Sequence, residues 1–380
     1  MIKTIFQRDV TRSALKIMGR SNQKRRLATH PKRHPVFVRP TIDFTQEETI
    51  LQNLIPQIRE DILNESLVYQ KNMPTVRGHV ENLINDTVGD LKPKFLNCAL
   101  IAIYAYKYFK QDHTEEELVK AGILGWCYKL QDLAMIIVDD ILDESKIRYN
   151  KPPLYRVVGI KQAILDSIIL ESAANFLVLK YFSDHKHLVK IQKDLILNIA
   201  TTTISQKQEL SKYEIDELEV FENLIKSFPL LIHAVTSAVY LAGIDDPKIQ
   251  SIVKKFCVDI AIFGKRYDDF TVFLDPKTIG EKDNTDIVSF KITWMAIQVS
   301  KMGSPQQKKT FMKHYGHSDP ESVAIIFDIY RELNLVEHFD KYMMEFYDDM
   351  LTQIQNLPPQ LPKEFFYNIL DCAVANKMYA

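Results

Sequence analysis

Residues 114–143 read TEEELVKAGILGWCYKLQDLAMIIVDDILD, and this stretch decides the fold. Thr114 followed by Glu117 predicts a capping box, so a helix begins here and can continue to about Asp143. A helix of about 29 residues is about 43 Å long, enough to cross a whole domain. Residues 133–138 are apolar on every side of such a helix, so we expect it to be buried. The sequence therefore predicts a long central helix.

Acidic residues stand at the end of this predicted helix. Asp139 and Asp143 are four residues apart, which places their side chains on one face. Such a pair is more often a solvated face than a metal site, but at the end of a buried helix unpaired charge is costly. Asp268 and Asp269 follow a second mainly apolar run. Two such pairs facing each other would suit Mg²⁺ ions that bridge to phosphate oxygens.

The composition favours a soluble helical protein with an unusual charge distribution. Hydrophobic residues make up 46% of the 380 residues, glycines number only 11, and strand-like alternation is scarce. Residues 1–40 contain 11 Lys/Arg and one acid, so the remainder contains 37 basic and 48 acidic residues. We therefore expect no nucleic-acid partner. We also expect no transmembrane segment, and four free cysteines in a reducing compartment.

The first 40 residues differ from the rest of the chain. They are rich in Lys and Arg, almost free of acids, and carry apolar residues at roughly helical spacing: Ile2, Phe6, Val10, Leu15 and Met18. This pattern predicts a mitochondrial transit peptide, and the alternative is a disordered basic arm on a cytoplasmic protein. Prolines at 31, 35 and 40 then predict a linker. Residues 41–380 follow as one all-α catalytic domain.

Two further helix boundaries are predicted by local signals. Asp319 and Pro320 supply an N-cap and a first-turn proline for the apolar run that follows, and Gly316 is a suitable C-cap for the preceding helix. Pro229 falls within an otherwise helical run over 221–241. A proline inside a helix removes a hydrogen bond, so we expect a kink there.

Several motifs together resemble one family. The stretch from Leu124-Gly-Trp-Cys127 to Asp143, followed by Arg148, resembles the first aspartate-rich region of trans-isoprenyl diphosphate synthases, farnesyl diphosphate synthases in particular. Further matches are Tyr240-Leu-Ala-Gly-Ile244, Asp268-Asp269, Thr285-Asp286-Ile287, Lys291, Tyr315-Gly316 and Leu357-Pro-Pro359. The resemblance covers about residues 50–375. It implies a single isoprenoid-synthase-type helical bundle around a deep central cavity, and a homodimer.

The resemblance also implies a site. It places three Mg²⁺ ions between Asp139 and Asp143 on one wall and Asp268 on the other, holding a prenyl diphosphate. The basic residues that would help to bind this diphosphate are Arg148, Lys226, Lys282 and Lys291. Of all these residues, the ones expected to act in catalysis are Asp139, Asp143, Arg148, Lys226 and Asp268.

Three further positions would contact the hydrocarbon of the substrate. Ala134 and Met135 stand where farnesyl synthases place bulky aromatics that limit chain length, so a small Ala134 would admit a C15 chain or longer. Tyr267 precedes Asp268 and could face a carbocation, although a core aromatic is the simpler reading.

The sequence departs from the family at a second diphosphate pocket, which chain-elongating members use for isopentenyl diphosphate. Asp90 replaces a lysine, Pro93 an arginine, Asp132 a glutamine and Tyr149 an arginine, with Lys94 as partial compensation. Added carboxylates should repel a diphosphate. These departures predict a Mg²⁺-dependent terpene synthase, a carbon–oxygen lyase like the insect enzymes of isoprenyl-diphosphate-synthase type. It would ionise farnesyl diphosphate and release a sesquiterpene and diphosphate.

Two alternatives remain open from the sequence. The first is a trans-prenyltransferase that condenses isopentenyl diphosphate with an allylic diphosphate, as the family resemblance alone would suggest. The second is an inactive paralogue that regulates an active synthase, against which the retention of Asp139, Asp143, Asp268 and Arg148 argues.

Overall fold

The computed structural model describes residues 43–69, 73–89, 97–149, 151–211, 213–223, 229–274 and 286–374. Within these ranges every regular element is a helix, and the only β-type pairing is an isolated bridge between Arg148 and Lys151. The α-helices are α2 (Thr45–Ser66), α3 (Pro74–Ile84), α4 (Asn97–Phe109), α5 (Glu115–Leu142), α6 (Leu154–Val158), α7 (Ile160–Phe182), α8 (Leu188–Glu209), α9 (Pro229–Leu241), α10 (Pro247–Leu274), α11 (Trp294–Met302), α12 (Pro305–His314), α13 (Pro320–Glu332), α14 (Leu335–Gln355) and α15 (Lys363–Val374). The predicted all-α fold is confirmed.

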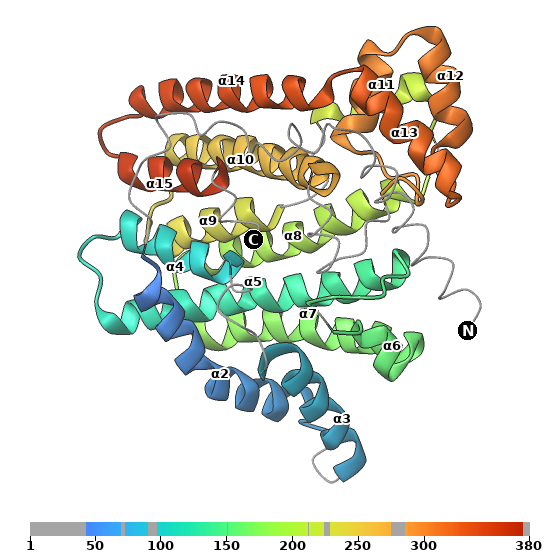
Figure 1. Cartoon of the computed structure of the whole chain (residues 1–380). Helices are drawn as coiled ribbons and strands as arrows, with labels where there is room; N and C mark the ends of the chain where they lie inside the picture. The colour runs from blue at the N-terminus through green and yellow to red at the C-terminus, as the bar shows by residue number, and fades with distance from the viewer. Residues whose placement is uncertain are drawn as a thin grey trace.

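Helix α5 lies at the centre of the bundle. It packs against α2, α4, α7, α8 and α9. Figure 1 shows α14, α10, α8, α5 and α7 roughly aligned across the molecule, with α11, α12 and α13 gathered at one end. Because neighbours cover α5 on several sides, most of its apolar residues are buried, including Leu133, Ala134 and Ile137, whereas Met135 and Ile136 are partly exposed.

Local signals fix where several helices begin. The Thr114 hydroxyl accepts a hydrogen bond from the Glu117 amide at 3.2 Å, and the Glu117 carboxylate accepts one from the Thr114 amide at 2.9 Å. This is the predicted capping box, and α5 then continues without a break to Leu142. Asp319 likewise caps α13 by accepting from the Ser322 amide at 2.8 Å. Both predicted starts are confirmed.

The kink predicted at Pro229 stays a prediction. Within the described residues, a 3₁₀ helix, η4, covers Ile215–Asn223, and α9 is described from Pro229 onward. The predicted kink falls on residues 224–228, which lie outside the described part of the chain.

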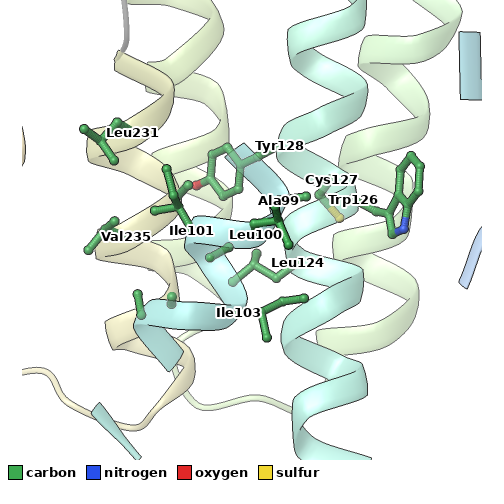
Figure 2. Close-up of a cluster of buried hydrophobic side chains, with 14 of the residues drawn as sticks. Ala99, Leu100, Ile101, Ile103, Leu124, Trp126, Cys127, Tyr128, Leu231 and Val235 are labelled. Carbon is green, nitrogen blue, oxygen red and sulfur yellow. The ribbon is translucent and has the colours of Figure 1, made fainter. Parts of the chain in front are cut away.

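Helices α4 and α5 approach each other closely at Gly125. A Cβ atom at this position would stand 2.7 Å from the Ala99 carbonyl oxygen and 3.0 Å from its Cα. Figure 2 shows α4 beside α5, with Leu124 and Tyr128 of α5 on the side of α4 and Trp126 pointing away from it. The labelled neighbours on α4 and α9 are Ala99, Leu100, Ile101, Ile103, Leu231 and Val235. On the opposite side the Trp126 indole donates to the Leu51 carbonyl at 3.0 Å. Glycine is therefore the residue that sets the α4–α5 distance.

Buried apolar side chains form two clusters. The larger, here the main core, draws on α2 to α5, α7 to α10, α14 and α15. The smaller, the second core, joins α11 to α13 with η4, the end of α10 and the start of α14. Tyr267 and Tyr342 are partly buried and pack against both. All four cysteines are buried and free, as predicted.

Two of the described helices, α5 and α7, are long and apolar enough to cross a membrane by length and composition alone. In α5 this composition belongs to a core helix, since 78% of its apolar window is buried in the bundle. In α7 only 44% of the window is buried. The exposed remainder of α7 is an apolar surface.

Candidate functional site

The carboxyl-terminal end of α5 carries the first acidic group, and Arg148 folds back onto it. The Arg148 guanidinium donates from Nη2 to Asp139 Oδ2 at 2.9 Å and to Asp140 Oδ1 at 2.7 Å. Its Nε donates to the same Asp140 oxygen at 2.9 Å. Asp140 is nearly buried, whereas 28% of the Asp139 side chain is exposed. Asp140 therefore anchors the guanidinium, and Asp139 faces accessible space beside it.

Lys291 approaches the same helix end from the loop before α11. Its Nζ donates to Asp143 Oδ2 at 2.5 Å and lies 4.0 Å from Asp286 Oδ1. Burial lowers the pKa of Lys291, but the charges of Asp286, Asp143 and Asp139 outweigh burial and raise it above its ordinary value. The ammonium is therefore held in its charged form between acids from two distant parts of the chain.

The second acidic pair lies at the carboxyl-terminal part of α10. Asp269 is buried, forms an ion pair with Lys265 Nζ at 2.8 Å, and accepts the Trp294 amide at 2.8 Å. Burial raises the pKa of Asp269 to about 6, although Lys265 lowers it. The neighbouring Asp268 is half-buried. Asp269 is thus a structural anchor, and Asp268 is the more accessible acid of the pair.

Electrostatic contacts connect the two acidic groups. Burial lowers the pKa of Lys265, but nearby carboxylates raise it well above its ordinary value. These carboxylates belong to Asp269, Glu209, Asp268 and Asp286. Because Asp286 acts electrostatically on both Lys291 and Lys265, the two acidic groups share one charged neighbour. The structure therefore brings Asp139, Asp143, Arg148, Lys291 and Asp268 together in one region.

The remaining predicted site residues are placed less directly. Lys226 and Lys282 lie outside the described residues. Met135 is half-buried one turn before Asp139, whereas Ala134 is 2% exposed and belongs to the main core. Tyr267 packs with ring centroids 5.9 Å from Phe263 and 6.0 Å from Phe339. Their contacts with substrate stay predictions.

Three residues of this site were not among the predicted ones. Asp140 accepts hydrogen bonds from Arg148 and orients it. Lys265 forms an ion pair with Asp269. Asp286 acts electrostatically on both Lys291 and Lys265. Asp140 had a signal, since it adjoins Asp139 and a long cation follows eight residues later. For Lys265 and Asp286 the signal is weaker, because their partners are brought close only by the packing of α10 against the segment that leads into α11.

The oxygen ligands fit Mg²⁺ bound together with a diphosphate. In the described residues no group of three or more His, Cys, Asp or Glu side chains forms a closed metal site. Mg²⁺ characteristically takes one or two carboxylates and completes its shell with water and substrate phosphates. Asp139, Asp143 and Asp268 offer such carboxylates at an accessible helix end. Use of Mg²⁺ is general in the family to which the following comparisons lead.

Comparison with known proteins agrees with this site. Residues 96–333 match the family described as polyprenyl synthetase. The chain is 29% identical over 282 residues to a farnesyl pyrophosphate synthase of Murgantia histrionica, covering 71% of this chain and 69% of that protein. It is 30% identical over 277 residues to the mitochondrial farnesyl pyrophosphate synthase 1 of Arabidopsis thaliana, with 68% and 71% covered. It is 29% identical over 282 residues to the farnesyl pyrophosphate synthase of Rattus norvegicus, covering 71% of this chain and 78% of that protein.

The described part of the chain is thus an all-α bundle in which two aspartate pairs and several cations act electrostatically on one another. The matched segment extends over more than half of the chain, so this protein belongs to the polyprenyl synthetase family. The predicted resemblance to trans-isoprenyl diphosphate synthases is thereby confirmed.

The predicted terpene synthase, a carbon–oxygen lyase, is wrong. The relatives named above are farnesyl pyrophosphate synthases, which favours the prenyltransferase alternative. The error arises because the charge at each altered position was considered without the residues that surround it in the fold. Asp132 was counted as an unpaired charge, but its carboxylate accepts a hydrogen bond from the buried Lys129 at 2.7 Å. The negative charge that Asp132 adds at the second pocket is therefore offset by Lys129.

Proposed function

We propose that this protein is a trans-prenyltransferase that condenses isopentenyl diphosphate with an allylic diphosphate. The products are a longer allylic diphosphate, inorganic diphosphate and a proton. The observation that supports this most is the convergence of Asp139 and Asp143 with Asp268, bridged by Lys291, Asp286 and Lys265. Membership of the polyprenyl synthetase family points the same way.

The difficult step is the loss of diphosphate from the allylic substrate. The C1–O bond breaks, its electron pair leaves with the diphosphate, and C1 becomes cationic. The double bond of isopentenyl diphosphate then supplies the electrons of the new C–C bond, and a proton is lost from the neighbouring carbon. Mg²⁺, in three ions as the family resemblance implies, would supply positive charge to the leaving diphosphate.

The chain's own cations act on the same leaving group. In the structure Arg148 pairs with Asp139 and Lys291 pairs with Asp143, the acids expected to bind metal. Both keep further donors with which to bind a diphosphate oxygen. A cation that is already oriented in a partly buried site stabilises developing negative charge better than water does. We assign Arg148 and Lys291 to this role.

The hydrocarbon would extend from the acids back along α5. Met135 is half-buried one helical turn before Asp139 and faces the same side. Ala134 beside it is small, and a larger residue there would shorten the space along the helix. We therefore assign Met135 and Ala134 to the control of product length.

The experiment is product analysis. The protein is incubated with Mg²⁺ and geranyl diphosphate, with and without isopentenyl diphosphate, and both prenyl diphosphates and hydrocarbons are quantified. We expect farnesyl diphosphate only when both substrates and Mg²⁺ are present. The proposal would be contradicted if no combination of C5, C10 and C15 substrates gave a prenyl diphosphate of greater chain length.

We propose a homodimer formed through α7 and α8. These two helices are adjacent, and both expose large aliphatic side chains. We call this set the α7–α8 apolar face: Ile160, Ile164, Leu165, Ile168, Leu179, Val189, Ile196, Leu197 and Ile204. A contiguous exposed apolar surface of this kind is typical of a protein interface. Two copies related by a two-fold axis would cover it in both.

We also propose that residues 1–40, which lie outside the described part, direct the protein to mitochondria. Their basic composition with a single acid supports this, and one relative carries the word mitochondrial in its name. A reporter fused to residues 1–40 should enter mitochondria, and a chain beginning at Thr41 should keep its activity. Cytosolic retention of the reporter would contradict the import of this chain.

A further inference from the structure

Among the accessible residues in the carboxyl-terminal half of helix α5, five form one line along the helix. Asp132, Met135, Ile136, Asp139 and Asp143 are partly exposed, at spacings that place them on one face. Asp132 precedes Asp139 by seven residues, about 10.5 Å along the helix axis. The line therefore has a charged group at each end and hydrocarbon between them.

The charged group at the far end is an ion pair. Lys129 Nζ donates to Asp132 Oδ2 at 2.7 Å, and the two side chains are 2% and 28% exposed. Tyr128 and Leu130 on either side of Lys129 are fully buried. Burial lowers the pKa of Lys129, but Asp132 and other neighbouring groups raise it above its ordinary value. A charged ammonium thus stands at a core position, directed at the accessible face by Asp132.

Tyr149 adjoins this pair. Burial raises its pKa, and the charge of Lys129 counteracts part of that rise, so the two groups are within electrostatic reach. Cys98 of α4 also acts on Lys129. Tyr149 directly follows Arg148, which binds Asp139 and Asp140. The loop after α5 therefore connects the two charged ends of the accessible line.

A condensation of two diphosphates needs two anion sites that are separate but close. The first is the acidic end of α5, where metal can bind. Lys129 is a cation at the other end of the accessible line, paired with Asp132, which precedes Asp139 by about two helical turns. An ammonium has three donors, and the bond to Asp132 uses one of them. Its flexible four-carbon stem lets the charge follow an incoming anion.

We propose that Lys129 binds the diphosphate of the second, non-allylic substrate, and that Asp132 competes with this diphosphate for the ammonium. The proposal rests on the function proposed above and deepens it. Lys129 would be a specificity-determining residue, since it acts on isopentenyl diphosphate and not on the allylic substrate bound near Asp139. Asp132 holds the ammonium in place while the pocket is empty and weakens binding when the substrate arrives.

The two partners therefore have opposite expected effects. Lys129→Met removes the cation and keeps the shape of the side chain, so the dissociation constant of isopentenyl diphosphate should rise by roughly tenfold or more. Asp132→Asn removes the competing charge and should lower the same constant several-fold. A pair that only stabilises the fold would give changes of the same sign in both variants.

The test is calorimetric titration of the full chain with isopentenyl diphosphate, and separately with geranyl diphosphate and Mg²⁺. Lys120→Met, at an exposed lysine on the same helix, is the matched control and should behave as the parent protein. We expect geranyl diphosphate to bind all variants within about twofold. Should Lys129→Met not fold, Lys129→Arg with Asp132→Asn carries the comparison.

Three results would overturn the assignment of Lys129. One is unchanged binding of isopentenyl diphosphate in Lys129→Met. The second is equal weakening of both ligands, and the third is weakening rather than tightening in Asp132→Asn. A failure of the proposed function would give a different result. Binding of isopentenyl diphosphate would still depend on Lys129, but the protein would not form a prenyl diphosphate of greater chain length.

Discussion

Asp139 and Asp143 are the residues on which the reaction depends most directly. We expect Asp139→Asn or Asp143→Asn to lower turnover by at least about a hundredfold, because several kcal/mol of leaving-group stabilisation would be lost. The melting temperature should stay nearly unchanged, since Arg148 keeps its bonds to Asp140 when Asp139 is neutralised. Turnover and thermal unfolding are measured on the same preparations.

The matched control for these variants is Glu116→Gln, at an exposed acid in the first turn of α5. It removes the same charge from the same helix, far from the acidic end. Full activity in Asp139→Asn or Asp143→Asn would remove these residues from the metal site.

Asp166 on α7 gives a second prediction at this scale. Burial raises the pKa of its carboxyl, while the charge of His79 acts in the opposite direction. The folded state therefore binds this proton more readily than the unfolded state, and the contribution of Asp166 to stability falls as the pH rises above about 4. Asp166→Asn should be more stable than the parent protein at pH 7 and similar to it at pH 4.

Urea unfolding at both pH values measures this difference. Asp184→Asn, at an exposed carboxyl just beyond α7, is the control. A stability gain in Asp166→Asn that is equal at pH 4 and pH 7 would show that ionisation is not its cause.

Side chains of the site differ in how far the sequence can predict them. Asp139 and Asp143 are four residues apart, so helix geometry places them on one face, and Arg148 follows closely enough in the chain to reach them from the next loop. Lys265 and Asp286 meet through packing between distant segments, and no local spacing encodes that approach. Lys129 was missed for another reason: a lysine in an apolar run is read as a break in the pattern, not as a directed charge.

At the scale of single helices, the contact of α4 with α5 can be tested at one glycine. Gly125→Ala places a methyl group 2.7 Å from the Ala99 carbonyl oxygen, a backbone atom that cannot turn away. We expect a loss of about 1–3 kcal/mol in the free energy of unfolding. Urea denaturation measures it.

Gly78→Ala is the matched control, since no atom lies within 4 Å of a Cβ at that position in α3. Alanine favours a helix over glycine by up to about 1 kcal/mol, so this variant should be neutral or stabilised. Equal effects at the two glycines would mean that α4 and α5 can separate without loss.

Element boundaries were predictable where a signal is local. The capping box at Thr114 and the cap at Asp319 depend on residues within four positions, and both are found. Pro229 has two helical roles, an interior kink or a first residue, and its immediate neighbours do not distinguish them. Residues 224–228, which would distinguish them, lie outside the described part of the chain.

For the whole molecule, the α7–α8 apolar face predicts the oligomeric state. The parent protein should have twice the 44.1 kDa mass of one chain in light scattering. Ile164→Glu with Ile168→Glu places two charges on this face and should yield monomers, because a buried unpaired carboxylate opposes association.

Met344→Glu, at an exposed apolar residue of α14, is the control and should leave the mass unchanged. A monomeric parent protein, or a dimer that tolerates both charges in α7, would assign this face another role.

The acids at the end of α5 would be lost at different rates in evolution. In a lineage released from the need for the reaction, Asp139 could be replaced at little cost, because Arg148 keeps its bonds to Asp140. Loss of Asp140 would instead leave a largely buried guanidinium without its main partner, which is strongly destabilising. Asp140 would therefore outlast the activity, and a descendant that has lost the reaction would still carry this acid.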